Sequence, residues 1–257
     1  LNEDYYGNKP YIEQLVFRYY PDSAAALQAY KNGQVLGINL INSDVLADAL
    51  NQQNLAVYTG RLPELSIVML NLENDEAPFL DQVNIRRALY LGINRQSIID
   101  QIIGGQGILA DGPIFPGTWA FYDGTPRVDF DAERAKQLLD EAGFTISTEN
   151  ASQRVSTDGT VLAFNLLYPE DEQHRLIAEA IQRDWANIGV TVTLEAAAYD
   201  VLVLDRLTNR NYQAALVDMN LSRYPDPDPY PFWDSIQATG GQNYSQWDHK
   251  IASEYLE

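Results

Sequence analysis

Short apolar runs alternate with segments of helical periodicity along most of the chain, and this order predicts an α/β fold. The apolar runs that are short enough for one buried strand are 65–72, 161–168, 190–196 and 212–219. The segments with helical spacing of apolar residues are 82–92, 95–105, 132–142, 172–188 and 199–209. The last three strands alternate with two helices, so we expect a compact α/β lobe there.

The first part of the chain shows the same alternation. A run rich in β-branched and aromatic residues at 15–20 and an apolar run at 35–41 predict two strands. A helix is expected after each strand, at 24–33 and at 44–53. This order favours a second α/β unit with a partly parallel sheet, and residues 56–64 then form a plausible crossing between two lobes.

Polar residues before the helices predict where each helix begins. We expect N-caps at Asp22 or Ser23, at Ser43, at Asp81 and at Asp131. Gly33 and Gly143 stand where helices commonly end. Two loops are also expected, a segment rich in glycine and proline at 104–124 and a polar surface segment at 145–160.

Residues 222–250 combine prolines, aspartates and aromatic side chains. The prolines at 225, 227, 229 and 231 fix φ and remove main-chain donors, so we expect a stiff, extended loop without a helix. The aromatic residues that this loop presents are Tyr224, Tyr230, Phe232, Trp233, Tyr244 and Trp247. Each ring could simply cover a sheet edge, but so many in one stiff segment predict that at least two face a ligand.

Composition excludes several classes of function. The net charge of −19 would repel phosphate backbones and anionic membrane surfaces, so nucleic acid is not an expected partner. The absence of cysteine excludes disulfides, thiolate metal sites and cysteine nucleophiles. No apolar run reaches the roughly 18 residues that span a bilayer. The chain begins at Leu1 and reads as a piece of a longer protein.

Candidate catalytic groups are few. Asp226 and Asp228 could act as the acid and base of a glycoside-active enzyme, but in an extended chain residues at i and i+2 point to opposite sides. A loop-structuring role is the better interpretation. His174 and His249 have no ligand partner at helical spacing, so we interpret both as ordinary surface residues. We therefore expect no catalytic residue, no metal site and no cofactor.

Several segments resemble one known family in the same order over nearly the whole chain: 5–35, 70–99, 132–144, 158–168, 181–195 and 226–248. They include an Asn, Pro-Phe and Asp pattern before the helix with Arg86, and the run DPDPYPFWDS from Asp226 to Ser235. Together they resemble the family 5 extracellular solute-binding proteins of ABC importers, which include the oligopeptide- and dipeptide-binding proteins.

The resemblance implies a periplasmic-binding-protein-like clamshell of type II, with mixed sheets flanked by helices. Residues 1–65 would then be part of the first lobe, and residues 66–257 most of the second, C-terminal lobe. Chains of this family are about twice as long, so the sequence would be a fragment. We expect such a fragment to bind solute weakly or not at all by itself.

The resemblance also implies a ligand-binding surface. In the family, the strand that matches 212–220 and the loop after it pair with a peptide main chain by strand addition. The residues this points to are Asp218, Met219, Asn220, Ser222, Arg223, Tyr224, Asp226 and Trp233. Peptide-binding relatives have an Asp soon after this strand that holds the ligand's amino group, whereas Ser222 or Arg223 stands there in this chain. An oligosaccharide stacked on the aromatic rings is therefore the alternative ligand.

The expected partners follow from the same resemblance. They are an oligopeptide or another small solute, and the permease subunits of an ABC importer in the membrane. The protein would act as a monomer outside the cytoplasm, in the periplasm or at the outer face of the cell membrane, where a lipid anchor could hold it.

Overall fold

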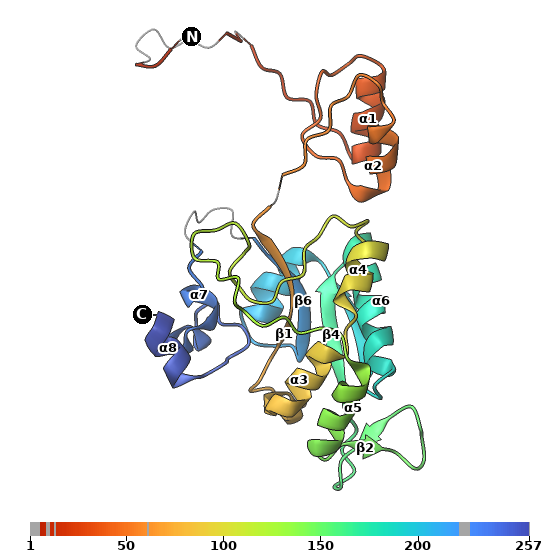
Figure 1. Cartoon of the computed structure of the whole chain (residues 1–257), viewed down its shortest axis with the longest axis vertical. Coiled ribbons are helices and arrows are strands. Elements are labelled where there is room, and N and C mark those ends of the chain that lie inside the picture. The colour runs from red at the N-terminus through yellow and green to blue at the C-terminus, as the bar shows by residue number, and fades with distance from the viewer. Residues whose placement is uncertain (1–5, 9–10, 13, 61, 221–226, 257) are drawn as a thin grey trace. The chain divides into compact units, whose positions relative to one another are not determined.

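The computed structural model describes residues 6–8, 11–12, 14–60, 62–220 and 227–256 (Figure 1). The chain divides into two compact units, Leu1–Gly60 and Arg61–Glu257. The assignment of lobes, with its boundary after residue 65, stays a prediction.

The first unit contains two helices, α1 (Ser23–Lys31) and α2 (Ser43–Leu50). Asp22 caps α1, because its carboxylate accepts a main-chain hydrogen bond of 2.7 Å from the first turn. Asn42 occupies the N-cap position of α2 and Ser43 is the first helical residue, so the predicted cap is wrong by one position. The pattern of apolar residues is nevertheless sufficient to predict both helices.

The strands predicted at 15–20 and 35–41 are not formed in the described residues of this unit. Leu15, Phe17 and Leu36 are largely exposed instead. A strand requires main-chain hydrogen bonds to a neighbouring strand, and a β-rich composition does not supply that neighbour. Both strand predictions are therefore wrong for the structure of this unit.

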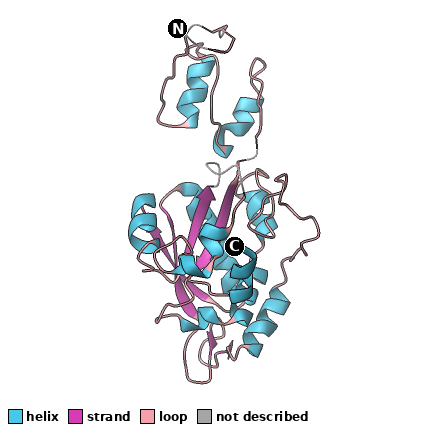
Figure 2. Ribbon diagram, turned by 90° about the vertical axis from the view of Figure 1, so that its left-hand side faces the viewer, coloured by secondary structure: helices cyan, strands magenta, loops and turns pink. Residues whose placement is uncertain are grey.

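The second unit is built on a mixed sheet, drawn in magenta in Figure 2. The sheet has four strands in the order β1-β6-β4-β5. Its strands are β1 (Glu64–Leu70), β4 (Ala163–Pro169), β5 (Thr191–Ala197) and β6 (Ala214–Asn220). β1 runs antiparallel to β6, while β4 is parallel to both β5 and β6. All four strands predicted from the apolar runs of this unit are confirmed.

One face of the sheet holds the larger core. The helices α3 (Val83–Leu91), α4 (Arg95–Gln101), α5 (Ala132–Glu141) and α6 (Glu172–Ala186) contribute to it, on the side away from α7 and α8 (Figure 1). Trp185 is 1 % exposed, its ring meets Phe164 edge-on at 5.4 Å, and its indole nitrogen donates to the Leu89 carbonyl at 2.9 Å. These contacts fix α6 against β4 and α3.

The other face holds a smaller core, which we call the second core cluster: Met69, Leu167, Leu202, Leu207, Tyr212, Ala215, Val217 and Met219. The π-helix η2 (Val201–Leu207) and α7 (Tyr230–Trp233) contribute to this core. The 3-10 helix η3 (Ser235–Ala238) and α8 (Lys250–Leu256) contact α7. The prediction that residues 222–250 contain no helix is wrong. Pro231 lies in the first turn of α7, where its missing N–H has no helical partner to lose.

Most helix ends follow the predicted pattern. Asp131 caps α5 through a 2.8 Å hydrogen bond, and Gly143 follows that helix with φ of +87°, a conformation that favours glycine. Asn94 caps α4 and accepts from Ser97 at 3.0 Å. The cap predicted at Asp81 is wrong, because Asp81 closes the 3-10 turn η1 (Pro78–Asp81) and Gln82 precedes α3.

The segment 145–160 is more than the polar surface loop that its composition predicts. It contains a short hairpin of β2 (Thr145–Ile146) and β3 (Arg154–Val155). Arg154 is only 2 % exposed, and its guanidinium donates to the carbonyls of Phe144 at 2.6 Å and Ile188 at 2.8 Å. It also pairs with Asp140 at 2.6 Å, so this buried charge fastens the hairpin to the core.

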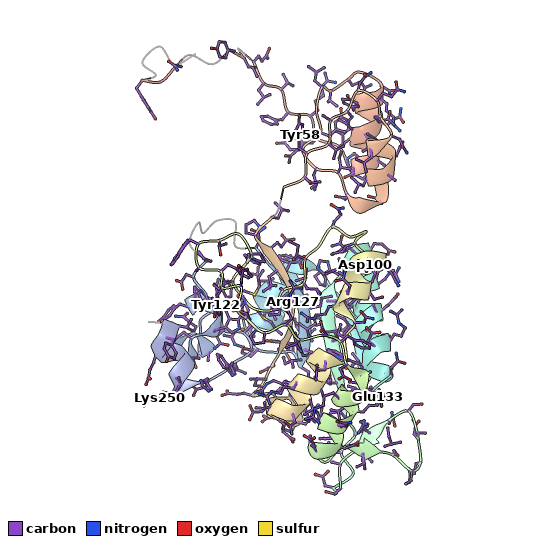
Figure 3. All side chains as sticks on the ribbon, viewed as in Figure 1. Tyr58, Asp100, Tyr122, Arg127, Glu133 and Lys250 are labelled. Atoms are coloured by element: carbon purple, nitrogen blue, oxygen red, sulfur yellow. The ribbon has the colours of Figure 1, made fainter. Side chains whose placement is uncertain are left out.

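The loop between α4 and α5 is confirmed as an irregular segment. Residues 104–130 contain neither helix nor strand, and Tyr122 and Arg127 lie along it (Figure 3). Trp119 and Tyr122 are 80 % and 73 % exposed. This loop therefore carries aromatic side chains at the surface, in contrast to the aromatic residues near α7.

Candidate functional site

The candidate site lies where β4 and β6 separate. In the described part of the chain these strands pair only through Leu166–Ala214 and Leu167–Ala215, and β6 then continues to Asn220 beside β1 alone. β5 lies on one side of β4, and the chain returns to place β6 on the other side. Ligands of open α/β sheets bind outside the carboxyl ends of strands at such a switch in direction. The topology therefore marks this end of the sheet.

A cavity of about 510 Å³ opens at this place. Its lining comes from the ends of β4, β5 and β6, the start of β1 and the first turn of α6: Glu64, Pro169, Glu170, Asp171, His174, Ala198, Tyr199, Asp218 and Asn220. Four of these side chains are carboxylates, and the described lining contains neither Lys nor Arg. The charged side chains of the described lining are therefore all acidic or histidine, and the formal charge of the cavity is negative.

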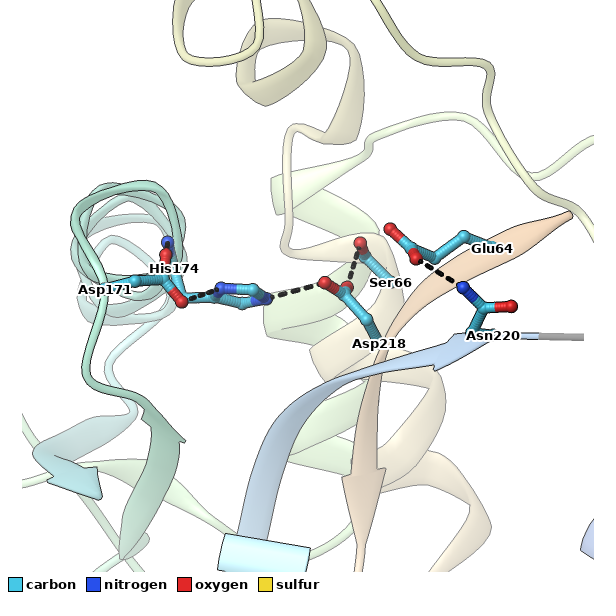
Figure 4. Close-up of polar contacts among 6 residues, drawn as sticks. All are labelled: Glu64, Ser66, Asp171, His174, Asp218 and Asn220. Atoms are coloured by element: carbon cyan, nitrogen blue, oxygen red, sulfur yellow. Dashed lines mark hydrogen bonds and ion pairs between the residues drawn. The ribbon is translucent and has the colours of Figure 1, made fainter. Parts of the chain in front are cut away.

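A chain of polar contacts crosses the site from α6 to β1 (Figure 4). Nδ1 of His174 lies 2.6 Å from Oδ2 of Asp171, and Nε2 lies 3.0 Å from Oδ2 of Asp218. The Nε2–H bond does not point straight at that oxygen, so the second contact is an ion pair rather than a well-aligned hydrogen bond. The Ser66 hydroxyl donates to the other Asp218 oxygen at 2.5 Å.

The register of β1 and β6 explains why these side chains meet. Ser66 stands directly opposite Asp218, and Glu64 stands opposite Asn220. Alternate residues of a strand face the same side of the sheet, so all four point to the face that α6 covers. The Asn220 amide donates to Glu64 at 3.2 Å, one step farther along the same face.

The first turn of α6 positions the imidazole. Asp171 caps this helix by accepting from the main-chain nitrogen of His174 at 2.9 Å through Oδ1. Its second oxygen contacts the side chain of the same histidine. Because the cap and the imidazole contact use one carboxylate, the helix start fixes the direction in which the ring points.

The contacts shift the protonation of His174. The contact with the Asp218 carboxylate is the largest cause that raises the pKa of the imidazole, and burial opposes it. The charges of both aspartates and the hydrogen bond to Asp171 raise the pKa further. His174 is 8 % exposed, so these interactions act in a partly desolvated place.

Asp218 shows the complementary effect. Burial alone would raise the pKa of its carboxyl, but the contacts with His174 and Ser66 outweigh burial and leave the pKa below its usual value. The carboxylate is therefore ionised at neutral pH. The ionised Asp218 in turn favours the protonated form of the His174 imidazole.

The structure separates the residues of the predicted ligand-binding surface. Asp218 and Asn220 line the cavity. Met219 points to the opposite face and is 6 % exposed in the second core cluster, and Trp233 packs against the same cluster. Ser222, Arg223, Tyr224 and Asp226 lie outside the described residues.

The interpretation of His174 as a surface residue is wrong. The side chain is buried and contacts two carboxylates, one from the N-cap of its own helix and one from β6. The spacing of Asp171 and His174 at the end of an apolar run is a usable signal, because a capping Asp at i−3 can reach the side chain. The partner in β6 is 44 positions away in sequence (218 − 174) and could not be found from spacing.

The aromatic residues near α7 mainly pack inward. Phe232, Trp233 and Tyr244 contact the second core cluster, and the rings of Phe232 and Trp233 meet edge-on at 5.7 Å. Trp247 stacks on His249 with ring centres 5.4 Å apart. Asp228 accepts a hydrogen bond of 2.9 Å from the Tyr230 nitrogen, which is the loop-structuring role expected for it.

Within the described residues, no group of three or more His, Cys, Asp or Glu side chains could hold a metal ion. No helix in the described part of the chain combines the length and apolar character needed to cross a bilayer.

The fold and the site together define a class of protein. The chain has the α/β fold of type II periplasmic-binding proteins, present here as part of a clamshell. With 24% identity and a TM-score of 0.78, it is similar to the oligopeptide-binding protein AppA of Bacillus subtilis in complex with a nonapeptide, and the likeness covers 92% of this chain and 46% of that one. This likeness shows the fold.

Sequence comparison gives the family. Residues 1–242 match the family described as bacterial extracellular solute-binding proteins, family 5 Middle, and the chain belongs to it. It is 28% identical over 253 residues to the dipeptide-binding protein of Escherichia coli (strain K12), covering 96% of this chain and 44% of that protein. It is also 29% identical over 198 residues to the nickel-binding periplasmic protein of the same organism, covering 75% of this chain and 37% of the relative. The chain thus spans less than half the length of these relatives.

Proposed function

We propose that the protein is the solute-binding component of an ABC importer and that it binds a peptide or a similar small solute beside the end of β6. The observation that carries this proposal is the acidic cavity at the point where β4 and β6 separate. Membership of an extracellular solute-binding family supports it. The names of the relatives describe binding proteins, and we propose no enzymatic activity.

Strand addition is the proposed mode of binding. Residues 216–220 of β6 have a strand neighbour on the β1 side, and in the described chain β4 no longer pairs with them on the other side. A peptide main chain placed there would form hydrogen bonds that do not depend on the side chains of the ligand. Specificity would come from side chains that line the cavity, above all Asp218, Asn220 and Tyr199.

The rest of the proposed surface follows β6 into the next segment. We propose that Ser222, Arg223, Tyr224 and Asp226 extend it. Met219 would take part through its main chain, because its side chain is buried, and Trp233 through the exposed part of its ring. Sugar stacking is less well supported, since Phe232, Trp233 and Tyr244 contact the second core cluster.

The proposed partners are the solute and the membrane permease of the importer. Closure of two lobes around the solute would create the surface that the permease recognises. We propose that the protein acts as a monomer outside the cytoplasm, where relatives of this family bind their solutes.

Identification of the bound solute tests the proposal. The full-length protein is purified under native conditions, released from its ligand by denaturation, and the released molecules are analysed by mass spectrometry. Peptides that rebind the emptied protein in calorimetry, at Kd values of roughly micromolar, are the expected result. Recovery of only oligosaccharides, with no rebinding of peptides, would contradict it.

A further inference from the structure

His174 connects helix α6 with the end of strand β6. It belongs to the first turn of α6, yet its ring reaches Asp218, which lies beyond Ala215, the last β6 residue that pairs with β4. The described contacts of the Asp218 side chain are with this ring and with Ser66 on β1. The imidazole therefore spans the separation between α6 and the end of β6.

Both ring nitrogens face carboxylate oxygens. A neutral imidazole carries one N–H, so the other nitrogen would bring an electron pair close to an anion 2.6 Å or 3.0 Å away. Only the imidazolium carries a hydrogen on both nitrogens and the positive charge that both aspartates favour. The contacts of the ring with both aspartates are thus favourable when it is an imidazolium and electrostatically unfavourable when it is neutral.

Among the described residues that line the cavity, no other cation could replace the imidazolium of His174. The other titratable groups that line the cavity around the ring are Glu170 after β4, Glu64 on β1 and Tyr199 after β5. Two of these groups are acidic, and in the described lining no lysine or arginine could neutralise Asp218 if His174 became neutral. Loss of the proton would leave Asp171 and Asp218 as unbalanced charges on either side of the ring.

If the proposed function holds, the protonation state of His174 therefore affects the edge of β6 where solute binds. We propose that His174 is a positioning residue that works as an imidazolium: while doubly protonated it holds Asp218 and the end of β6 in their binding geometry, and loss of one proton weakens solute binding. This inference rests on the proposed function and adds the regulation of the same site by pH.

Peptide affinity at two pH values tests the inference in the full-length protein, with trialanine as the probe. Wild type, His174→Gln and His249→Gln are compared by calorimetry at pH 6 and pH 9. The amine of the peptide titrates in this range for every variant, so the readout is the affinity of wild type divided by that of the variant. His249 is exposed and stacks on Trp247, which makes it a matched control.

The expected ratio for His174→Gln is about tenfold at pH 6 and close to one at pH 9, because a one-unit pKa difference between bound and free protein changes affinity tenfold. For His249→Gln the ratio is close to one at both values. An equal ratio for His174→Gln at both pH values would overturn the inference alone. Failure of trialanine to bind wild type at either pH would overturn the proposed function, and the inference with it.

Two further measurements keep the test decisive if His174→Gln does not fold. Imidazole ¹⁵N shifts of the ligand-free protein at pH 7 are expected to show a doubly protonated His174, and a neutral ring would overturn the inference. Asp171→Asn keeps a good helix cap and removes one carboxylate from the ring. The pH midpoint of trialanine binding should then move down, and an unchanged midpoint would contradict the role of this contact.

Discussion

The aromatic segment 227–249 and the cavity beside β6 differ in how well the composition of each region indicates its role. The aromatic segment has an unusual composition, yet Phe232, Trp233 and Tyr244 pack against the second core cluster. The cavity is lined by ordinary residues that come from the ends of different strands and one helix. A conspicuous composition can therefore serve packing, while a site can arise where the topology leaves a strand edge exposed.

Removal of an aromatic side chain near α7 should have the largest effect, and on stability. Phe232→Ala takes away a half-buried ring that contacts Trp233 and the second core cluster. We expect a loss of about 2–3 kcal/mol in the free energy of unfolding, below the range for fully buried rings. Urea denaturation of the full-length protein measures it.

Tyr122→Ala is the control for this change. Tyr122 is 73 % exposed, so its removal should alter stability by less than about 0.5 kcal/mol. Equal effects of the two variants would show that the aromatic segment does not contribute to the core. Unchanged peptide affinity in folded Phe232→Ala would separate packing from binding.

A change in the cavity should act on binding more than on folding. Asp218→Asn keeps the shape of the side chain but removes the charge that pairs with His174. We expect a roughly tenfold loss of peptide affinity, about 1.4 kcal/mol, in calorimetry of the full-length protein. Asp75→Asn removes an exposed carboxylate outside the cavity and should leave affinity unchanged. Equal affinities of wild type and Asp218→Asn would refute the role of this carboxylate.

Removal of the hydroxyl beside Asp218 should have a smaller effect. Ser66→Ala deletes one hydrogen bond to a charged, partly buried carboxylate. We expect a loss of about 1 kcal/mol in the free energy of unfolding, less than is usual for a bond to a charged group, because Ser66 is exposed to solvent. Ser66→Thr retains the hydroxyl and should recover part of that loss; no difference between the Ala and Thr variants would contradict the bond.

The smallest effect is a dependence of stability on pH. The pKa of His174 is higher in the folded protein, so its contacts stabilise the fold fully below the unfolded value of about 6.5. This contribution is lost as pH rises through the raised folded pKa, with a slope of at most about 1.4 kcal/mol per pH unit. His174→Gln should reduce the dependence of the free energy of unfolding on pH above pH 6.5, as measured by denaturation curves. An unchanged dependence would show that other groups cause it.

The sequence predicts the four strands of the main sheet of the second unit well, because each of them carries its own local signal. The buried runs of β1, β4, β5 and β6 consist of local apolar residues, and the cap of α5 depends on Asp131 alone. Asn94 caps α4 in the same local way. Residues close in sequence are therefore sufficient to predict where these strands run and where a helix such as α5 begins.

Features that depend on distant partners could not be predicted. The runs at 15–20 and 35–41 have strand composition, but in the described unit no neighbouring strand pairs with them. His174 gains its role from Asp218, which another strand brings to it. The prolines near α7 indicate a barrier to helix, although Pro231 fits in a first turn. In each case, tertiary contacts decide what local residues leave open.

Hydrogen exchange of the full-length protein, with and without its co-purified solute, shows whether solute binds beside β6. We predict that solute slows exchange of the amides in residues 216–220 of β6, while the amides of 230–244 change little. Protection confined to 230–244, with residues 216–220 unaffected, would contradict the placement of the binding site beside β6.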